Sequence, residues 1–190
     1  MNKYIFFKQT VGNRDSVFNY LKENCFKGKP IKILEIGCLR DANEGSRRGD
    51  GWSDFHWVDY QDKYGGDLTI CDINRDNLNV SKVLISDFPR INGLSVNFLH
   101  DDGFKVIKSN PNYDFYYLDG GDNPYESLDQ FEAIPHGKII LIDDAHTKGM
   151  IITNKYKNYI CFGWKGHDHK MVLYSSDIKE YKEIILDKIE

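Results

Sequence analysis

Five short apolar runs, separated by segments of helical spacing, constrain this sequence of 190 residues more than any other feature. Each run is too short for a buried helix, and continuous apolar runs of this length are typical of strands covered on both faces. Strands that alternate with helices form a mostly parallel sheet, because the helices carry the chain back across its faces. The sequence therefore predicts a doubly wound α/β fold with helices on both faces. The runs occupy residues 31–36, 67–73, 94–99, 113–119 and 137–144.

The two ends of the chain extend this architecture. Residues 14–26 place apolar side chains at helical spacing, which predicts an amphipathic helix before the first strand. Strand-like runs at 156–164 and 169–176 flank a short polar segment, the pattern of a C-terminal antiparallel hairpin. We interpret His167 and His169 as turn and edge residues of that hairpin. Further helices are expected at residues 53–64, 75–85, 102–109 and 124–134.

The chain has the length of one domain, and no internal repeat or linker divides the sequence. We expect an N-terminal helical segment over residues 1–30, a ligand-binding core over 31–148, and the terminal hairpin and tail over 149–190. Substrate specificity is expected from residues 40–54, from 145–156 or from a partner subunit, so a homo-oligomer is possible.

Composition narrows the classes of partner. The 29 acidic and 25 basic residues are mixed along the chain and give a net charge of -4, so nucleic acid is not expected as a partner. No apolar run is long enough for a signal peptide or a membrane span, which predicts a cytoplasmic protein without a membrane partner. The four cysteines form no CxxC pair and are expected to be reduced core thiols.

Acids and glycines follow the predicted strands, and ligands of open α/β sheets bind at the carboxyl ends of their strands. Glu35 is suited to a ligand's hydroxyl or ammonium group, and Gly37 lets the backbone approach that ligand. Asp72 lies 35 residues after Gly37 and suits a ribose hydroxyl if the intervening loop is an insertion. That insertion, residues 41–54, is either a mobile loop over the site or a solvated connection.

Five segments between residues 31 and 148 are ILEIG, GDGWSDFHWVDYQDKYGGDLTICDIN, FLHDDG, YDFYYLDGGDNPYESLDQF and GKIILIDDAH. In sequence and in order, these segments resemble the class I S-adenosylmethionine-dependent methyltransferases. Within that class the sequence is similar to the metal-dependent small-molecule O-methyltransferases, akin to catechol O-methyltransferase and the cephalosporin-hydroxylase-like enzymes, most specifically over Tyr117–Glu126. The resemblance implies a Rossmann-like fold and an enzyme that uses S-adenosylmethionine as its methyl donor.

The resemblance also implies where the methyl donor binds. Glu35 and Gly37 match the positions at the donor's amino-acid end, and Asp72 matches the position at its ribose. Asp101 or Asp102 matches the position near its adenine. Asp119 matches the acid that follows the fourth strand beside the donor.

In the metal-dependent members, acids after the fourth and fifth strands hold magnesium, and here they match Asp119, Asp143 and Asp144. Three converging carboxylates repel one another, and a divalent cation with oxygen ligands relieves that repulsion. Mg²⁺ would orient substrate oxygens and lower the pKa of a hydroxyl group. The open alternative is that Asp143 and Asp144 cap a turn or helix start.

Two positions depart from the family pattern. The turn after the first strand has Leu39 where the family's second glycine stands. The position of the family's catalytic lysine is occupied by Asp122, so a catalytic base would be Asp122 or His146. His146 has the open alternative of a polar surface residue.

We therefore predict an S-adenosylmethionine-dependent methyltransferase that methylates a hydroxyl group of a small metabolite with Mg²⁺ assistance. A second reading is a binding module that keeps the fold and has lost turnover, as the irregular glycine turn suggests. A third reading, an NAD-dependent oxidoreductase, is disfavoured because G-x-G-x-x-G does not follow the first strand.

Overall fold

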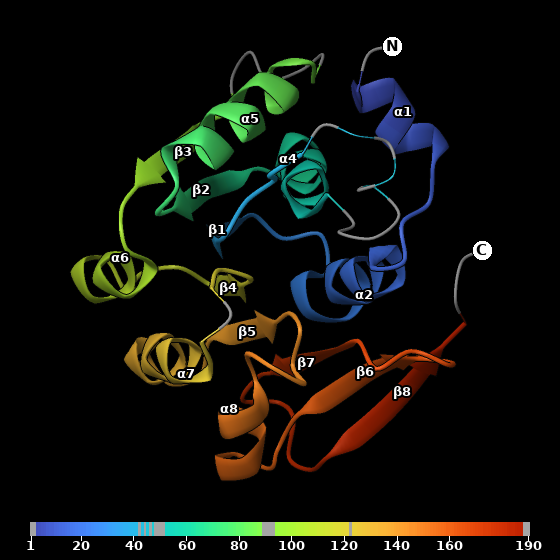
Figure 1. The fold of residues 1–190 in the computed structure, drawn as a ribbon, viewed down its shortest axis with the longest axis vertical. Helices are drawn as coiled ribbons and strands as arrows, with labels where there is room; N and C mark the ends of the chain where they lie inside the picture. Colours follow the sequence, from blue (N-terminus) through green and yellow to red (C-terminus); the bar gives the residue numbers. More distant parts are fainter. Residues whose placement is uncertain are drawn as a thin grey trace.

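A central sheet organises the protein, whose computed structural model describes residues 3–41, 43, 45, 47, 52–88, 94–121 and 123–187. In these residues the sheet has eight strands in the order β3-β2-β1-β4-β5-β7-β6-β8 (Figure 1). The strands are β1 (Ile31–Ile36), β2 (Gly66–Asp72), β3 (Val96–His100), β4 (Phe115–Leu118), β5 (Ile139–Ile142), β6 (Ile160–Trp164), β7 (Lys170–Tyr174) and β8 (Lys182–Leu186).

The strand directions confirm the predicted fold class. β1 pairs in parallel with both β2 and β4, so the strand order reverses between β1 and β4. β7 pairs antiparallel with β5 and with β6, which confirms the expected C-terminal hairpin. β8 was not predicted from the sequence; it pairs in parallel with β6 and forms an edge of the sheet.

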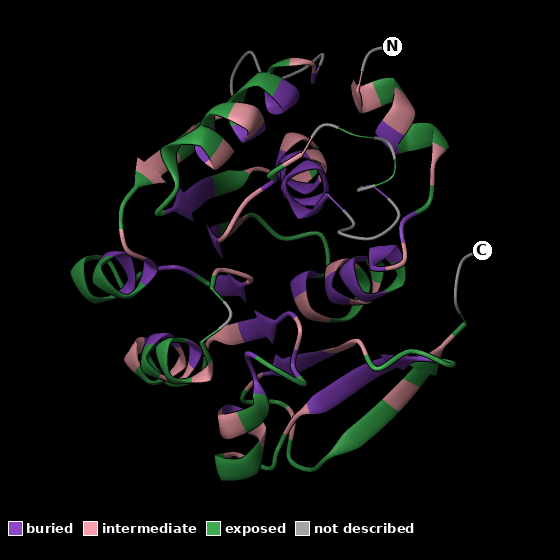
Figure 2. Cartoon of the chain, in the orientation of Figure 1, coloured by how far each residue is buried: buried purple, intermediate pink, exposed green. Residues whose placement is uncertain are grey.

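Helices cover both faces of the sheet, as Figures 1 and 2 show. Strand side chains alternate between the two faces, so Ile33 belongs to one apolar core and Leu34 to the other. The predicted helix over residues 14–26 is α-helical in its first half and continues as a wider π-helix. One face carries α1 (Lys3–Gln9), α2 (Asp15–Tyr20), η1 (Leu21–Phe26), α4 (Ser53–Tyr64) and α5 (Arg75–Ser86); the other carries α6 (Gly103–Ser109), α7 (Pro124–Ala133) and α8 (Met150–Lys155).

A buried ionic network ties the insertion between β1 and α4 to the core. Arg47 donates to both carboxylate oxygens of Asp15, at 2.8 and 2.6 Å. His56 Nε2 lies 2.9 Å from Asp15 Oδ1, and Lys22 Nζ lies 3.1 Å from His56 Nδ1. The insertion was expected to be mobile or solvated, but at Arg47 and Trp52 it packs into the core, where both side chains are buried.

The turn after β1 packs directly against the turn after β4. Gly37 has φ +86°, and a Cβ atom there would lie 2.8 Å from the carbonyl carbon of Asp119 and 2.8 Å from the nitrogen of Gly120. Only glycine meets both demands, because a side chain would be strained by the positive φ and would overlap backbone that cannot move aside. Gly37 therefore sets the spacing of β1 and β4 at their carboxyl ends.

We predict that Gly37→Ala lowers the free energy of unfolding by more than Gly137→Ala. Gly137 has the same φ, +86°, but a Cβ there would meet nothing within 4 Å. Positive φ alone costs alanine about 1–2 kcal/mol, and the overlap at Gly37 should add roughly 1–3 kcal/mol. Urea unfolding measures both values. Equal losses in the two variants would show that the turns are not closely packed.

We also predict that His56 makes stability fall as the pH falls. Burial and the nearby charge of Lys22 together lower the pKa of His56 to about 3, although Asp15 opposes the shift. Below the ordinary pKa of about 6.5, the unfolded chain binds a proton that the folded chain does not, so stability is lost by up to about 1.4 kcal/mol per pH unit.

His56→Gln should remove this contribution. The wild type should therefore lose more stability than the variant between about pH 6.5 and pH 4.5 in urea unfolding. His136→Gln, at an exposed turn, is the matched control. Parallel curves for the wild type and His56→Gln would contradict the prediction.

Candidate functional site

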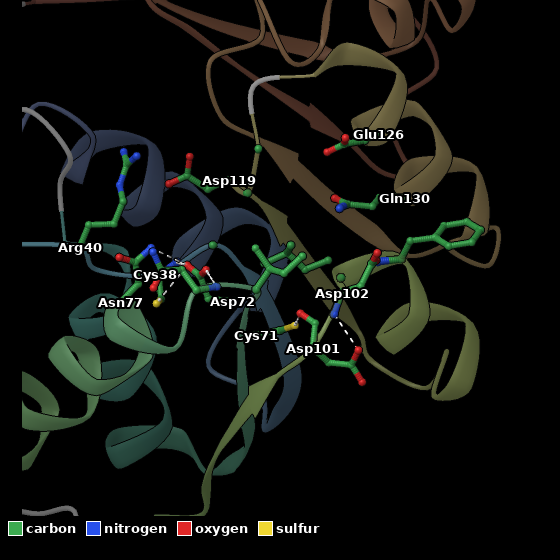
Figure 3. A pocket seen from close by; sticks show the side chains of 18 of the residues that line it. Cys38, Arg40, Cys71, Asp72, Asn77, Asp101, Asp102, Asp119, Glu126 and Gln130 are labelled. Atoms are coloured by element: carbon green, nitrogen blue, oxygen red, sulfur yellow. Dashed lines mark hydrogen bonds between the residues drawn. The ribbon is translucent and has the colours of Figure 1, made fainter.

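A pocket of about 410 Å³ opens at the carboxyl ends of β1 to β4, where the strand order reverses. This is the position at which open α/β sheets bind ligands, and the volume is that of a small-molecule site. Figure 3 shows Arg40 and Asp119 at one side of the pocket and Asp101 at the other. The lining residues are Ile36, Gly37, Cys38, Arg40, Cys71, Asp72, Ile73, Asn74, Asn77, Asp101, Asp102, Gly103, Phe104, Asp119, Gly120, Gly121, Glu126, Asp129 and Gln130.

Asp72 at the end of β2 anchors the turn that follows β1. Its Oδ2 accepts hydrogen bonds from the Cys38 backbone nitrogen at 3.3 Å and from Asn77 Nδ2 at 3.2 Å, and Oδ1 accepts one from the Asn74 nitrogen at 2.7 Å. The Cys38 thiol donates to the same Oδ2 at 3.4 Å. Asp72 therefore lines the pocket and also holds the backbone of the turn after β1.

Asp101 and Asp102 form the far wall of the pocket. Asp102 begins α6 and accepts a hydrogen bond from the Phe104 nitrogen at 2.8 Å, while Asp101 Oδ1 accepts one from the Asp102 nitrogen at 2.7 Å. Ile73 and Phe104 are 74% and 36% exposed, although both are large and apolar. Two exposed apolar side chains beside carboxylates suit a planar heterocycle with polar edges.

The predicted donor residue Glu35 does not line this pocket. Alternation along β1 directs Ile36 to the pocket and Glu35 to the opposite face, where it is fully buried and accepts a hydrogen bond from Ser53. Burial raises the pKa of Glu35 well above its usual range, and the adjacent Asp54 raises it further. The predicted base Asp122 lies outside the described residues.

The three predicted metal ligands, Asp119, Asp143 and Asp144, lie together beyond the ends of β4 and β5. We call these residues the carboxylate cluster. Lys148 is almost fully buried, and its Nζ lies 2.7 Å from Asp119 Oδ1 and 3.4 Å from Asp144 Oδ2. Arg14 Nη1 lies 2.8 Å from Asp143 Oδ2.

His169 also belongs to this region, although we interpreted it from the sequence as an edge residue. Its Nε2 lies 3.2 Å from Asp143 Oδ1, and its Nδ1 lies 2.7 Å from Asp144 Oδ1. Burial alone would lower the pKa of His169, but the adjacent carboxylates of Asp143 and Asp144 outweigh it and raise the pKa to about 9. The predicted base His146 is exposed, with its ring centroid 6.4 Å from that of His169.

The carboxylates of the cluster differ in the direction in which their pKa values are shifted. Burial alone would raise the pKa of Asp143, but the charge of Arg14 and the proximity of His169 hold it well below its usual range. Burial and the charge of Asp143 together raise the pKa of Asp119 to about 6, although the charge of Lys148 opposes the rise. Each carboxylate of the cluster therefore lies beside a cationic side chain of the chain itself.

The side chains present do not fit a hard divalent ion. Asp143, Asp144 and His169 offer possible ligand atoms within 4.8 Å of one another. Those atoms already pair with Arg14, with Lys148 or with each other. A metal ion would have to displace a buried cation, and like charges repel strongly in a site of low dielectric.

Several pocket and cluster residues have no counterpart in the sequence prediction. Asn77 has a local signal that could have indicated it, because it lies in the first turns of the helix that follows Asp72. Phe104 similarly follows the acids of the third strand. Arg14 and Lys148 carried no local signal, since they reach their partners from distant or irregular segments.

Comparison with known proteins places the fold. No family model and no curated protein matches the sequence. A candidate rRNA methylase from Clostridium thermocellum aligns with TM-score 0.58 at 11% identity, over 87% of this chain and 98% of that chain. A candidate class I S-adenosylmethionine-dependent methyltransferase from Listeria monocytogenes aligns with TM-score 0.57 at 13% identity, over 92% and 65%.

An O-methyltransferase from Bacillus cereus, solved in complex with SAH, aligns with TM-score 0.53 at 15% identity, over 85% of this chain and 81% of that chain. Within the described residues, each helix is too short or too polar to cross a bilayer. The pocket at the strand reversal and these alignments agree with the resemblance seen in the sequence. This chain has the Rossmann-like fold of the class I S-adenosylmethionine-dependent methyltransferases.

Proposed function

We propose that this protein is a methyltransferase that binds S-adenosylmethionine in the pocket at the ends of β1 to β4 and methylates a hydroxyl group of a small metabolite. The observation that carries the proposal is the combination, in one pocket, of a glycine turn, an acid after each of three strands and an exposed apolar wall. Carboxylates accept from ribose hydroxyls and from an amino group, and an apolar wall packs against adenine.

The pocket has a suitable group for each part of the donor. Asp101 or Asp102 would accept from the adenine amino group, with Phe104 against the ring. Asp72 and Asn77 would bind the ribose hydroxyls. Arg40 is a cation at the opposite side and would bind the donor's carboxylate. Glu35 would act at a distance, by fixing α4 beneath the turn that follows β1.

When bound, the donor supplies an electrophilic methyl group on a sulfonium. The protein must align an acceptor oxygen with that methyl group and accept the hydroxyl proton. Asp119 lies where the pocket meets the carboxylate cluster, so the acceptor would approach there. His146, exposed beside the cluster, stays our proposed base, together with Asp122. No step of this proposal passes through a metal ion.

The acidic surroundings of the pocket support a small acceptor. Asp101, Asp102, Glu126 and Asp129 all line it. A phosphate backbone would be repelled by so many carboxylates. We therefore do not propose rRNA, which appears in the name of one structural relative, as a substrate of this chain.

A binding module without turnover is the second candidate. The turn after β1 has Leu39 in place of a glycine, and its backbone N–H donates to Asp54 Oδ1 at 3.3 Å rather than facing the pocket. Asp72 accepts from four donors of the protein itself. Both features leave fewer polar groups for the donor than the family pattern would provide.

We predict that S-adenosylmethionine binds in isothermal titration calorimetry and that Phe104→Ala weakens this binding roughly tenfold, since stacking of a base on an aromatic ring is worth about 1–3 kcal/mol. Tyr125→Ala is the matched control, because Tyr125 is an exposed aromatic of α7 that does not line the pocket. It should leave the affinity unchanged. An equal loss in both variants would place the donor elsewhere.

A titration with NAD and a screen of hydroxylated acceptors separate the remaining alternatives. Binding of S-adenosylmethionine with release of S-adenosylhomocysteine in an acceptor screen would support the enzyme. Donor binding without transfer to any hydroxylated acceptor would favour the binding module. Binding of NAD and not of S-adenosylmethionine would overturn the proposal.

A further inference from the structure

We infer that the chain's own cations, Lys148 above all, take the place of a divalent ion at the carboxylate cluster. The protein would then hold the turns after β4 and β5 together without a metal. The inference about metal binding stands on the cluster alone. Its consequence for methyl transfer rests on the proposed function.

Lys148 has the surroundings of a bound cation. Its Nζ lies 2.7 Å from Asp119 Oδ1, 2.9 Å from the Asp119 carbonyl oxygen and 3.4 Å from Asp144 Oδ2. The side chain is only 5% exposed. An ammonium group has three donors, and here three oxygens from the turns after β4 and β5 surround it. Lys148 therefore bridges the same two turns that a metal ion was expected to bridge.

Asp143 has its oxygens occupied as well. Its Oδ2 accepts from Arg14 Nη1 at 2.8 Å and from the Tyr117 hydroxyl at 3.1 Å. Its Oδ1 accepts from the Asp144 nitrogen at 2.8 Å and faces His169 Nε2 at 3.2 Å. A carboxylate has about four acceptor positions. A metal ion could bind Asp143 only by breaking one of these contacts.

The charges of the cluster point the same way. The carboxylates of Asp119, Asp143 and Asp144 face the permanent cations Arg14 and Lys148, and both of these cations are buried. Magnesium gives up its water reluctantly and needs unpaired oxygen ligands in return. An added divalent ion would meet buried positive charge instead, where such repulsion is weakly screened.

The position of Lys148 links this cluster to the donor pocket. Asp119 and Gly120 line the pocket, and Lys148 holds both the side chain and the carbonyl group of Asp119. Lys148 is thus a positioning residue, which acts on the pocket through Asp119. Its ammonium fixes one wall of the pocket, the task that a structural metal ion performs in other proteins.

The experiment compares melting temperatures with and without millimolar MgCl₂, MnCl₂ or ZnCl₂, followed by calorimetric titration with each ion. A bound ligand at about 100 times its dissociation constant raises the melting temperature of a domain of this size by several degrees. We expect no shift for the wild type. Lys148→Met, which keeps the chain length and removes the charge, should melt lower and regain stability with Mg²⁺ or Mn²⁺.

Two controls complete the comparison. Lys155→Met removes an exposed lysine paired with Glu132 at 2.6 Å and should respond to no ion. The double variant Lys148→Met/Asp119→Asn removes both members of one buried pair. It should melt above Lys148→Met and bind no ion, which tests the inference even if the single variant fails to fold.

Saturable binding of any of these ions to the wild type, abolished by Asp143→Asn, would overturn the inference. So would a Lys148→Met variant that folds and binds no ion. None of these measurements uses the methyl donor. Failure of the wild type to bind S-adenosylmethionine would therefore remove the proposed function and leave the inference on metal binding intact.

Discussion

Parallel pairing of β1 with both β2 and β4 is the constraint on which the rest of this structure depends. Three strands with one direction end at one edge of the sheet, so the polar residues that follow them are brought together. The reversal of strand order between β1 and β4 opens the pocket at that edge. Gly37 allows the two turns to touch, and Asp72 then holds the backbone after β1 in place.

The acids gathered at this edge repel one another, and the chain resolves the repulsion in two ways. Beneath the turn after β1, Glu35 and Asp54 are fully buried near neutral hydroxyl groups, and burial raises the pKa of Asp54 to about 6. Beyond β4 and β5, the charge of Arg14 lowers the pKa of Asp143, and Lys148 forms ion pairs with Asp119 and Asp144. Burial dominates the pKa of Asp54, and ion pairing dominates the pKa of Asp143.

Much of the fold could be predicted from the sequence because its signals are local. The run at 31–36 and the helical segment at 53–64 coincide with β1 and α4. β8 escaped prediction because residues 182–186 are half exposed and lack a continuous apolar run. The prediction for the insertion was wrong at Arg47, because its partner Asp15 lies on α2, 32 residues away in the sequence.

For the site, the sequence by itself determined which acids reach the end of the sheet, because a strand and the residue that follows it are read from neighbouring positions. Asp72, Asp101 and Asp119 accordingly line one pocket. Only the tertiary structure decided what these acids meet. Arg14 and His169 join the carboxylate cluster from opposite ends of the chain. Contacts between such distant segments leave no periodic trace in the sequence, since they arise from packing across the whole sheet.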